Sequence, residues 1–210
     1  NYDERVTKND VWWSDNGIDW HEATEKAPWS SRWDHATAVF NGKIFLSGGM
    51  ELGGKMFNDV WSTSDGVNWE LVTASAPWKE RQGHSMVTFH DKMWLVGILS
   101  DAEGGSVNDV WYTSDGLSWE KTLTNPAWLG REDHSVLVYK DKIFVFQGMN
   151  SNWKWTSDVW FSTDRQNVSE LTLGAGSFFS VYVSKNGEEK ILIEKEKNKK
   201  LPIASITKLM

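Results

Sequence analysis

Short apolar-rich runs alternate with polar turns along the first 165 residues of the chain. One such run is Val60-Trp61-Ser62-Thr63, and a second, Val67-Asn68-Trp69-Glu70-Leu71-Val72, alternates apolar and polar positions as a half-buried strand does. Asp65-Gly66 lies between the two runs, and an Asp-Gly pair supplies the positive φ angles of a type I′ turn. The pattern therefore predicts a β-hairpin over residues 60–72.

The same hairpin pattern recurs at a nearly constant interval. It opens with Asn-Asp-Val-Trp in three copies and with Ser-Asp-Val-Trp in the fourth. The first aspartates of the copies are Asp10, Asp59, Asp109 and Asp158, so the steps are 49, 50 and 49 residues. A fixed period of about fifty residues predicts a repeat architecture in which each repeat is one structural unit.

Each repeat contains a second predicted strand pair, which follows an Arg-x-x-His motif. The motif runs from Arg32 to His35, from Arg81 to His84 and from Arg131 to His134. Two apolar-rich runs that flank a turn follow each motif. Four short strands joined by hairpins make one blade of a β-propeller, so the repeat predicts this fold.

The number of blades follows from these runs. Residues 9–24 supply two strands, residues 35–73 and 84–124 supply whole blades, and residues 134–164 supply three strands, with a fourth predicted over residues 168–173. That makes about three and a half blades, whereas closed propellers typically have four to eight. We therefore expect further blades upstream of the first residue.

The combination of Arg-x-x-His, a strand pair that ends in Gly48-Gly49, and Asn-Asp-Val-Trp resembles the Kelch repeat over residues 9–165. The double glycine is complete only there, because Gly97-Ile98 and Gln147-Gly148 replace it in the later repeats. The Ser-x-x-Asp-Gly-x-x-Trp hairpins also resemble the Asp-box turns of sialidase-type propellers. Both resemblances imply an all-β fold, a partial β-propeller of four-stranded blades.

Charge and composition exclude several classes of function. The chain has a formal charge of −7 and no Cys. A nucleic-acid-binding surface needs a basic stripe, which the acidic balance disfavours. Without Cys there is no disulfide, no Cys-ligated zinc and no Cys nucleophile. The Kelch resemblance raises a copper oxidase of the galactose-oxidase kind, but that site needs a Tyr crosslinked to a Cys. No apolar run reaches the length that spans a membrane.

The residues that recur in every repeat are predicted to hold the fold rather than to carry chemistry. A metal cluster of His35, His84 and His134 is the alternative, but these side chains occupy equivalent places in successive blades, so we expect no metal site and no cofactor. The matching arginines are predicted to donate hydrogen bonds between blades. The tryptophans are predicted to pack between sheets, with an aromatic platform for a glycan as the alternative. The propeller is therefore predicted to be a binding or spacer module.

A second region begins after Trp160, where the repeat breaks. All 15 Trp lie at or before this residue. We predict a propeller domain over residues 1–165, or to about residue 173, and a linker over residues 166–176 that ends in the short flexible joint Gly174-Ala175-Gly176-Ser177. Residues 177–210 then begin a separate domain with a hairpin around Asn186-Gly187.

The C-terminal region contains a candidate nucleophile and base, Ser205 and Lys208. Residues three apart share one face of a helix, so the Lys208 amine would lie beside the Ser205 hydroxyl and, with a lowered pKa, would take its proton. Ser-x-x-Lys alone is a weak signal, because Ser118 to Lys121 and Ser151 to Lys154 have the same spacing inside the repeats. The catalytic pair predicted from the sequence is Ser205 and Lys208.

The predicted hairpin, a charged loop and Pro202-x-Ala-Ser-x-Thr-Lys-Leu-Met resemble the N-terminal end of the low-molecular-weight penicillin-binding proteins over residues 178–210. These are serine-type D-alanyl-D-alanine carboxypeptidases. The resemblance implies the start of an α-helix and of a truncated α/β domain, an acyl-Ser205 intermediate and a peptidoglycan stem peptide as substrate. It also implies an extracytoplasmic place in a bacterial cell envelope or periplasm.

The resemblance leaves part of that site outside the chain. The Ser-x-Asn and Lys-Thr-Gly motifs that complete it do not follow Lys208 within residues 1–210, so we expect this chain to be inactive alone. A targeting segment or membrane anchor would also lie outside. The alternative function is a non-catalytic Kelch propeller that binds a protein or a glycan. The sequence of the complete polypeptide would decide between the two.

Overall fold

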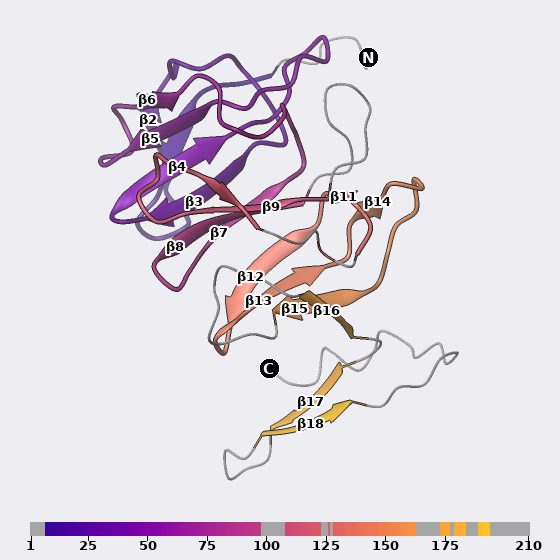
Figure 1. Cartoon of the computed structure of the whole chain (residues 1–210). Helices are drawn as coiled ribbons and strands as arrows, with labels where there is room; N and C mark the ends of the chain where they lie inside the picture. Colours follow the sequence, from indigo (N-terminus) through magenta and orange to yellow (C-terminus); the bar gives the residue numbers. More distant parts are fainter. Residues whose placement is uncertain are drawn as a thin grey trace.

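The computed structural model describes residues 7–97, 108–122, 126 and 128–162, together with the backbone of the strands at 173–176, 179–183 and 189–193. Within these residues every regular element is a β-strand, and no helix is long and apolar enough to cross a membrane. The strands form small antiparallel sheets that follow one another along the chain (Figure 1). The predicted all-β class is confirmed.

Three of the sheets are four-stranded blades, and their strand order is the chain order. Blade 1 contributes only β1 (Val11–Trp13) and β2 (His21–Thr24). Blade 2 contains β3 (Ala36–Phe40), β4 (Lys43–Ser47), β5 (Val60–Thr63) and β6 (Glu70–Thr73). Blade 3 contains β7 (Ser85–Phe89), β8 (Lys92–Val96), β9 (Val110–Thr113) and β10 (Glu120–Lys121). Blade 4 contains β12 (Ser135–Tyr139), β13 (Lys142–Phe146), β15 (Val159–Ser162) and β16 (Leu173–Gly176).

The first strand of each whole blade lies innermost. Strand β7 packs between β3 and β12, so the blades are arranged around a common axis. A small two-stranded sheet, β11 (Arg131–Glu132) with β14 (Met149–Asn150), ties two loops of blade 4 together. Strand β16 pairs with β15 as the fourth strand of blade 4, five residues beyond where the sequence predicted that strand to begin.

The hydrophobic core lies between blades rather than within one sheet. One cluster joins Phe40 and Phe45 of blade 2 to Met93 and Leu95 of blade 3, and another joins blade 3 to blade 4. Successive side chains of a strand point to opposite faces of the sheet, so the buried neighbours Phe45 and Leu46 of β4 belong to different clusters. Burial on both sides of a blade therefore depends on the neighbouring blade.

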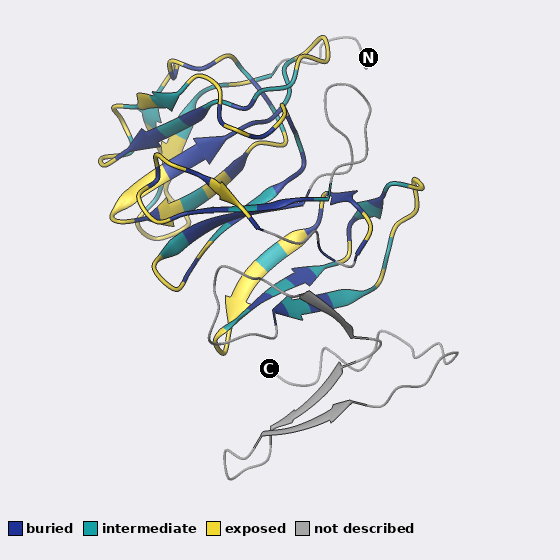
Figure 2. Ribbon diagram, in the orientation of Figure 1, coloured by how far each residue is buried: buried dark blue, intermediate teal, exposed yellow. Residues whose placement is uncertain are grey.

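The described blades form an open, partial propeller, as predicted. Phe40 and Phe89 end the inner strands of blades 2 and 3 and are only 2% and 5% exposed, because the next blade covers them. Tyr139 holds the same place in blade 4 and is 51% exposed. Figure 2 shows much of β12 as exposed for this reason.

The two hairpins of a blade use different turns, and the predicted type I′ turn at Asp65-Gly66 is wrong. Only Gly66 has a positive φ there, 76°. The loop is closed instead by the Asp65 carboxylate, which accepts hydrogen bonds from the backbone N–H groups of Val67 and Asn68 at 2.9 and 2.8 Å. The turn between β3 and β4 has positive φ at both Asn41 and Gly42, which is the type I′ pattern.

The region after blade 4 is described only in part. Gly174-Ala175-Gly176, predicted as a flexible joint, lie in β16, because pairing with the free edge of β15 gives their backbone groups partners. Strands β17 (Phe179–Val183) and β18 (Glu189–Ile193) form the predicted hairpin. The predicted helix start, Ser205 and Lys208 lie outside the described residues, and the domain boundaries stay a prediction.

Candidate functional site

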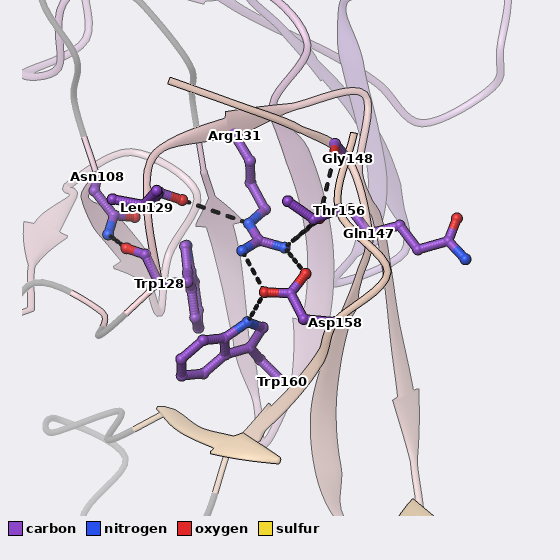
Figure 3. Close-up of polar contacts among 9 residues, drawn as sticks. All are labelled: Asn108, Trp128, Leu129, Arg131, Gln147, Gly148, Thr156, Asp158 and Trp160. Carbon is purple, nitrogen blue, oxygen red and sulfur yellow. Dashed lines mark hydrogen bonds and ion pairs between the residues drawn. The ribbon is translucent and has the colours of Figure 1, made fainter. Parts of the chain in front are cut away.

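The repeated arginine, aspartate and tryptophan of each blade form one hydrogen-bonded unit, which we call the seam. In blade 4, Arg131 donates from both terminal nitrogens to Asp158 at 2.8 and 2.9 Å, and the Trp160 indole N–H donates to the same carboxylate at 2.6 Å (Figure 3). Trp128 packs edge-on against Trp160, with ring centroids 5.5 Å apart. Burial acts to raise the pKa of Asp158, but the hydrogen bonds from Arg131 and Trp160 outweigh it and lower the pKa to about 2.

The same seam recurs in blades 2 and 3. Arg32 pairs with Asp59 at 2.6 Å, and Arg81 pairs with Asp109 at 2.8 Å. The side chain bonds within its own blade, while the Arg81 backbone N–H donates to the Phe57 carbonyl of the preceding blade at 3.0 Å. Arg81 therefore donates to the preceding blade, as the sequence predicted of these arginines, but through its backbone N–H, while the side chain holds its own blade together. All these polar groups have partners, so the seam has a structural role.

The repeated histidines pack against glycines of the preceding blade. A Cβ on Gly48 would lie 2.6 Å from Cε1 of His84, and one on Gly97 would lie 2.5 Å from Cε1 of His134. Burial, with a contribution from Arg131, lowers the pKa of His134 to about 4. Burial also lowers the pKa of His84 well below its ordinary value. Across the described part of the chain, no group of three or more His, Cys, Asp or Glu could hold a metal ion.

Two tryptophans of blade 4 depart from this structural pattern. Trp153 is 73% exposed and Trp155 is 70% exposed, whereas Trp160 in the seam of the same blade is 8% exposed. Both lie in the loop between β14 and β15, whose tip is exposed in Figure 2. We call residues 149–156 the aromatic loop. Its indole rings cost free energy in water and are not needed for the packing of the blade.

Backbone and side-chain hydrogen bonds hold the aromatic loop in one conformation. The Asn150 side-chain oxygen accepts from the backbone N–H groups of Asn152 and Lys154, and the Trp153 N–H donates to the Asn150 carbonyl at 2.8 Å. Ser151 N–H donates to the Gly130 carbonyl at 3.0 Å, which places the half-exposed Leu129 beside the loop. The loop therefore presents its aromatic rings from a defined frame.

The matching loop of blade 2 has the same frame but no tryptophan. There a bridge between Met50 and Met56 corresponds to the bridge between Met149 and Trp155. Gly54, with a φ of 91°, stands where Trp153 has a φ of 57°. A bulky side chain rarely adopts this left-handed conformation, and such strain concentrates at functional positions. The sequence prediction missed this site, although a comparison of the two loops in register would have found it.

The predicted catalytic pair, Ser205 and Lys208, lies outside the described residues and stays a prediction. The two other Ser-x-x-Lys spacings lie in blades: Ser118 follows the Asp115 turn, and Ser151 begins the tip of the aromatic loop.

Taken together, the blades and the seams define a Kelch-type β-propeller. The chain matches the family model of the KLHDC2/KLHL20/DRC7 Kelch-repeats domain over residues 1–175 and belongs to this Kelch-repeat family. No curated protein matches the chain. Among solved structures it is similar to one described as "Structure of YjhT", with a TM-score of 0.57 and 16% sequence identity. That match covers 74% of this chain and 48% of the other, so the chain spans about half the length of that relative.

Proposed function

We propose that this propeller is a protein-binding module and that the aromatic loop contacts the partner. Kelch propeller domains commonly bind protein partners, which supports the class of function. The observation that carries the proposal is Trp153, a highly exposed indole held at a positive φ where the matching loop of blade 2 has Gly54.

The physical properties of the loop fit a protein interface. Tryptophan is among the residues that contribute most to binding energy, because a large ring that leaves water at the centre of an interface gains much free energy. The hydrogen bonds of Asn150 hold the loop before binding, so less conformational entropy is lost when the partner docks. Trp153, Trp155 and Leu129 together provide the apolar centre of such a contact.

The experiment uses the residues of the matching loop as replacements. The double variant Trp153→Gly, Trp155→Met copies Gly54 and Met56 of blade 2, so it removes the rings and keeps the loop frame. Proteins from the source cells are captured on the wild type, on this variant and on a control, Trp20→Ser, which removes an exposed tryptophan of blade 1. Binding of the captured protein is then measured by calorimetry.

We expect the wild type and the Trp20→Ser control to bind the same protein, and the double variant to bind it at least about 100-fold more weakly. Circular dichroism should show all three proteins equally folded. Equal affinity of the wild type and the double variant would overturn the role of the loop. Retained binding to a glycan but to no protein would replace the proposal with a glycan platform.

We also propose a second function, for the polypeptide that carries residues 177–210: a serine-type D-alanyl-D-alanine carboxypeptidase. The observation in its favour is the motif that contains Ser205 and Lys208, after a hairpin made by β17 and β18. In this reaction Ser205 attacks the carbonyl carbon of the terminal D-alanyl peptide bond, Lys208 takes its proton, D-alanine leaves and water releases the acyl group. The substrate, a peptidoglycan stem peptide, would require an extracytoplasmic location.

A covalent probe tests this second function. Fluorescent penicillin should label a polypeptide that contains residues 1–210 with the Ser-x-Asn and Lys-Thr-Gly motifs, and Ser205→Ala should abolish the label. Ser118→Ala is the matched control, because Ser118 also precedes a lysine by three residues. Labelling that survives Ser205→Ala, or the absence of both motifs from the complete domain, would sink the proposal.

A further inference from the structure

Strands β5 of blade 2 and β9 of blade 3 hold equivalent places in the repeat, but the third residue of the strand differs between them. In blade 3 it is Tyr112, whose hydroxyl donates a hydrogen bond to Oε2 of Glu120 at 2.8 Å. The Lys92 ammonium lies 4.1 Å from the centre of the Tyr112 ring. A carboxylate acceptor and a cation over the ring face therefore hold this phenol from two sides.

Blade 2 keeps both partners of that phenol but lacks the phenol itself. Ser62 stands in place of Tyr112 and faces Glu70 across the strand pair, as Tyr112 faces Glu120. Lys43 holds the place of Lys92, opposite the last residue of the inner strand in each blade. Within the described residues, no hydrogen bond or ion pair is formed by the side chain of Lys43 or Glu70.

A cleft lies at this position, between blade 2 and the Asp115 turn of blade 3. Its volume is about 360 Å³, within the range of small-ligand pockets. The lining includes apolar side chains and polar ones: Phe45, Leu71, Leu117, Lys43, Glu70 and Asp115. The small Ser62 side chain also lines it, where blade 3 has a ring. We call this space the Ser62 cleft.

We infer that the Ser62 cleft binds the phenol ring of a tyrosine side chain from a protein partner. The hydroxyl donates to Glu70, the ring lies beside Lys43, and its edge contacts Leu71 and Leu117. This arrangement reproduces, with a ring from outside, the contacts that Tyr112 makes within blade 3. The inference rests on the proposed function only for the source of the tyrosine, because the cleft is separate from the aromatic loop.

The charges of the cleft select among aromatic groups. A phenylalanine ring would give Glu70 no donor, and a carboxylate that loses water without gaining a hydrogen bond is destabilised. A phosphotyrosine would bring two negative charges beside Glu70 and Asp115, and the like charges would repel it. Tyrosine is the side chain that satisfies both Glu70 and Lys43.

The test uses N-acetyl-L-tyrosinamide as the probe, with binding followed by ligand-observed nuclear magnetic resonance. We expect a dissociation constant on the order of 1 mM, as a single small side chain provides. N-acetyl-L-phenylalaninamide should bind about tenfold more weakly, because the hydrogen bond to Glu70 is lost. These measurements need no knowledge of the partner. The cleft inference can therefore fail while the aromatic-loop proposal stands, and the aromatic-loop proposal can fail while the cleft inference stands.

The decisive variant is Ser62→Tyr, which fills the cleft with the ring that blade 3 already has. It should weaken probe binding at least about tenfold and raise the midpoint of thermal unfolding. Glu70→Gln should weaken binding several-fold, whereas the matched control Glu120→Gln, in blade 3, should leave it unchanged. If Ser62→Tyr does not fold, Glu70→Gln and Lys43→Met decide alone, since both side chains are exposed.

Three results would overturn the inference. One is the absence of probe binding at concentrations well above the millimolar range. Another is equal affinity for the tyrosine and phenylalanine amides. The third is unchanged binding in Ser62→Tyr, or in both Glu70→Gln and Lys43→Met, because the probe would then occupy another place.

Discussion

The seam and the aromatic loop of blade 4 use tryptophan in opposite ways. Trp160 in the seam packs against Trp128, donates its N–H to Asp158 and is buried. Trp155, five residues earlier, is 70% exposed and follows a strained Trp153. A tryptophan at a position that recurs in every blade is explained by packing of the fold. A tryptophan that stands outside the repeated positions and is exposed to water costs free energy, so its presence needs another explanation.

The Ser62 cleft supports the same lesson from the other direction. There the departure is a missing ring rather than an added one, and it leaves Glu70 and Lys43 without the contacts that Glu120 and Lys92 have. Comparison between blades of one chain therefore serves as an internal control. Four predictions test the contrast between positions that recur in every blade and positions where one blade differs from the others.

The largest effect is expected from breaking a seam. Arg81 is fully buried, and Arg81→Met would leave the buried Asp109 carboxylate without its cation, at a cost of about 3–5 kcal/mol in the free energy of unfolding. Urea unfolding measures this cost. Adding Asp109→Leu should recover much of it, and the exposed Glu80→Gln should change little. A loss below about 1 kcal/mol would show that the seam does not hold the blades.

The second effect is a dependence of stability on pH through His134. Its pKa of about 4 in the folded protein is below the ordinary value of 6.5, so the unfolded chain binds the proton more tightly. Stability from this group is therefore complete above pH 6.5 and falls as the pH drops towards 4, by about 3 kcal/mol in all.

His134→Gln should flatten this part of the pH profile, measured by urea unfolding at a series of pH values. The exposed His21→Gln is the control and should leave the slope unchanged. If the slope of the His134→Gln variant matches that of the wild type, burial of His134 does not govern acid stability.

The third effect concerns Gly48, which packs against the His84 ring of the next blade. Gly48→Ala would place a methyl group 2.8 Å from the Arg81 carbonyl and 2.6 Å from the His84 ring, so we expect a loss of about 2 kcal/mol. Gln147 stands at the same place in blade 4 with a φ of 54°. Gln147→Gly should instead be neutral or stabilising by about 1 kcal/mol. Equal responses of the two positions in thermal unfolding would contradict this account.

The smallest effect on stability is expected in the aromatic loop. Trp153→Gly relieves a strained φ and removes an exposed ring, so thermal unfolding should show no change or a gain of up to about 1 kcal/mol. A loss of more than about 1 kcal/mol would mean that Trp153 holds the fold after all. In that case the contrast with Trp160 would disappear.

Much of the fold could be predicted from the sequence, because the same motif recurs at a fixed interval in each blade. The spacing of Asp10, Asp59, Asp109 and Asp158 located every blade, and the open propeller is confirmed. The type I′ turn at Asp65-Gly66 was wrong, since the Asp65 side chain replaces the expected backbone geometry with its own hydrogen bonds. The Asp-Gly pair alone does not reveal whether the backbone N–H groups of the turn will donate to a side-chain oxygen or to a backbone carbonyl.

The candidate sites were far less predictable. Trp153 and Trp155 were grouped with the other tryptophans, although Gly54 and Met56 hold their places in blade 2. Their exposure and the positive φ of Trp153 came only from the structure. Ser205 and Lys208 were chosen from a motif, and they stay a prediction because they lie outside the described residues.

The sequence by itself determined the period, the all-β class and the strands of the blades, because local alternation and turn chemistry act between neighbours in the chain. Only the tertiary structure decided which repeated side chains are buried and which positions remain open to a partner. Burial depends on the neighbouring blade, about fifty residues away. Phe40 and Tyr139 occupy the same place in the repeat, yet only one has a neighbour that covers it.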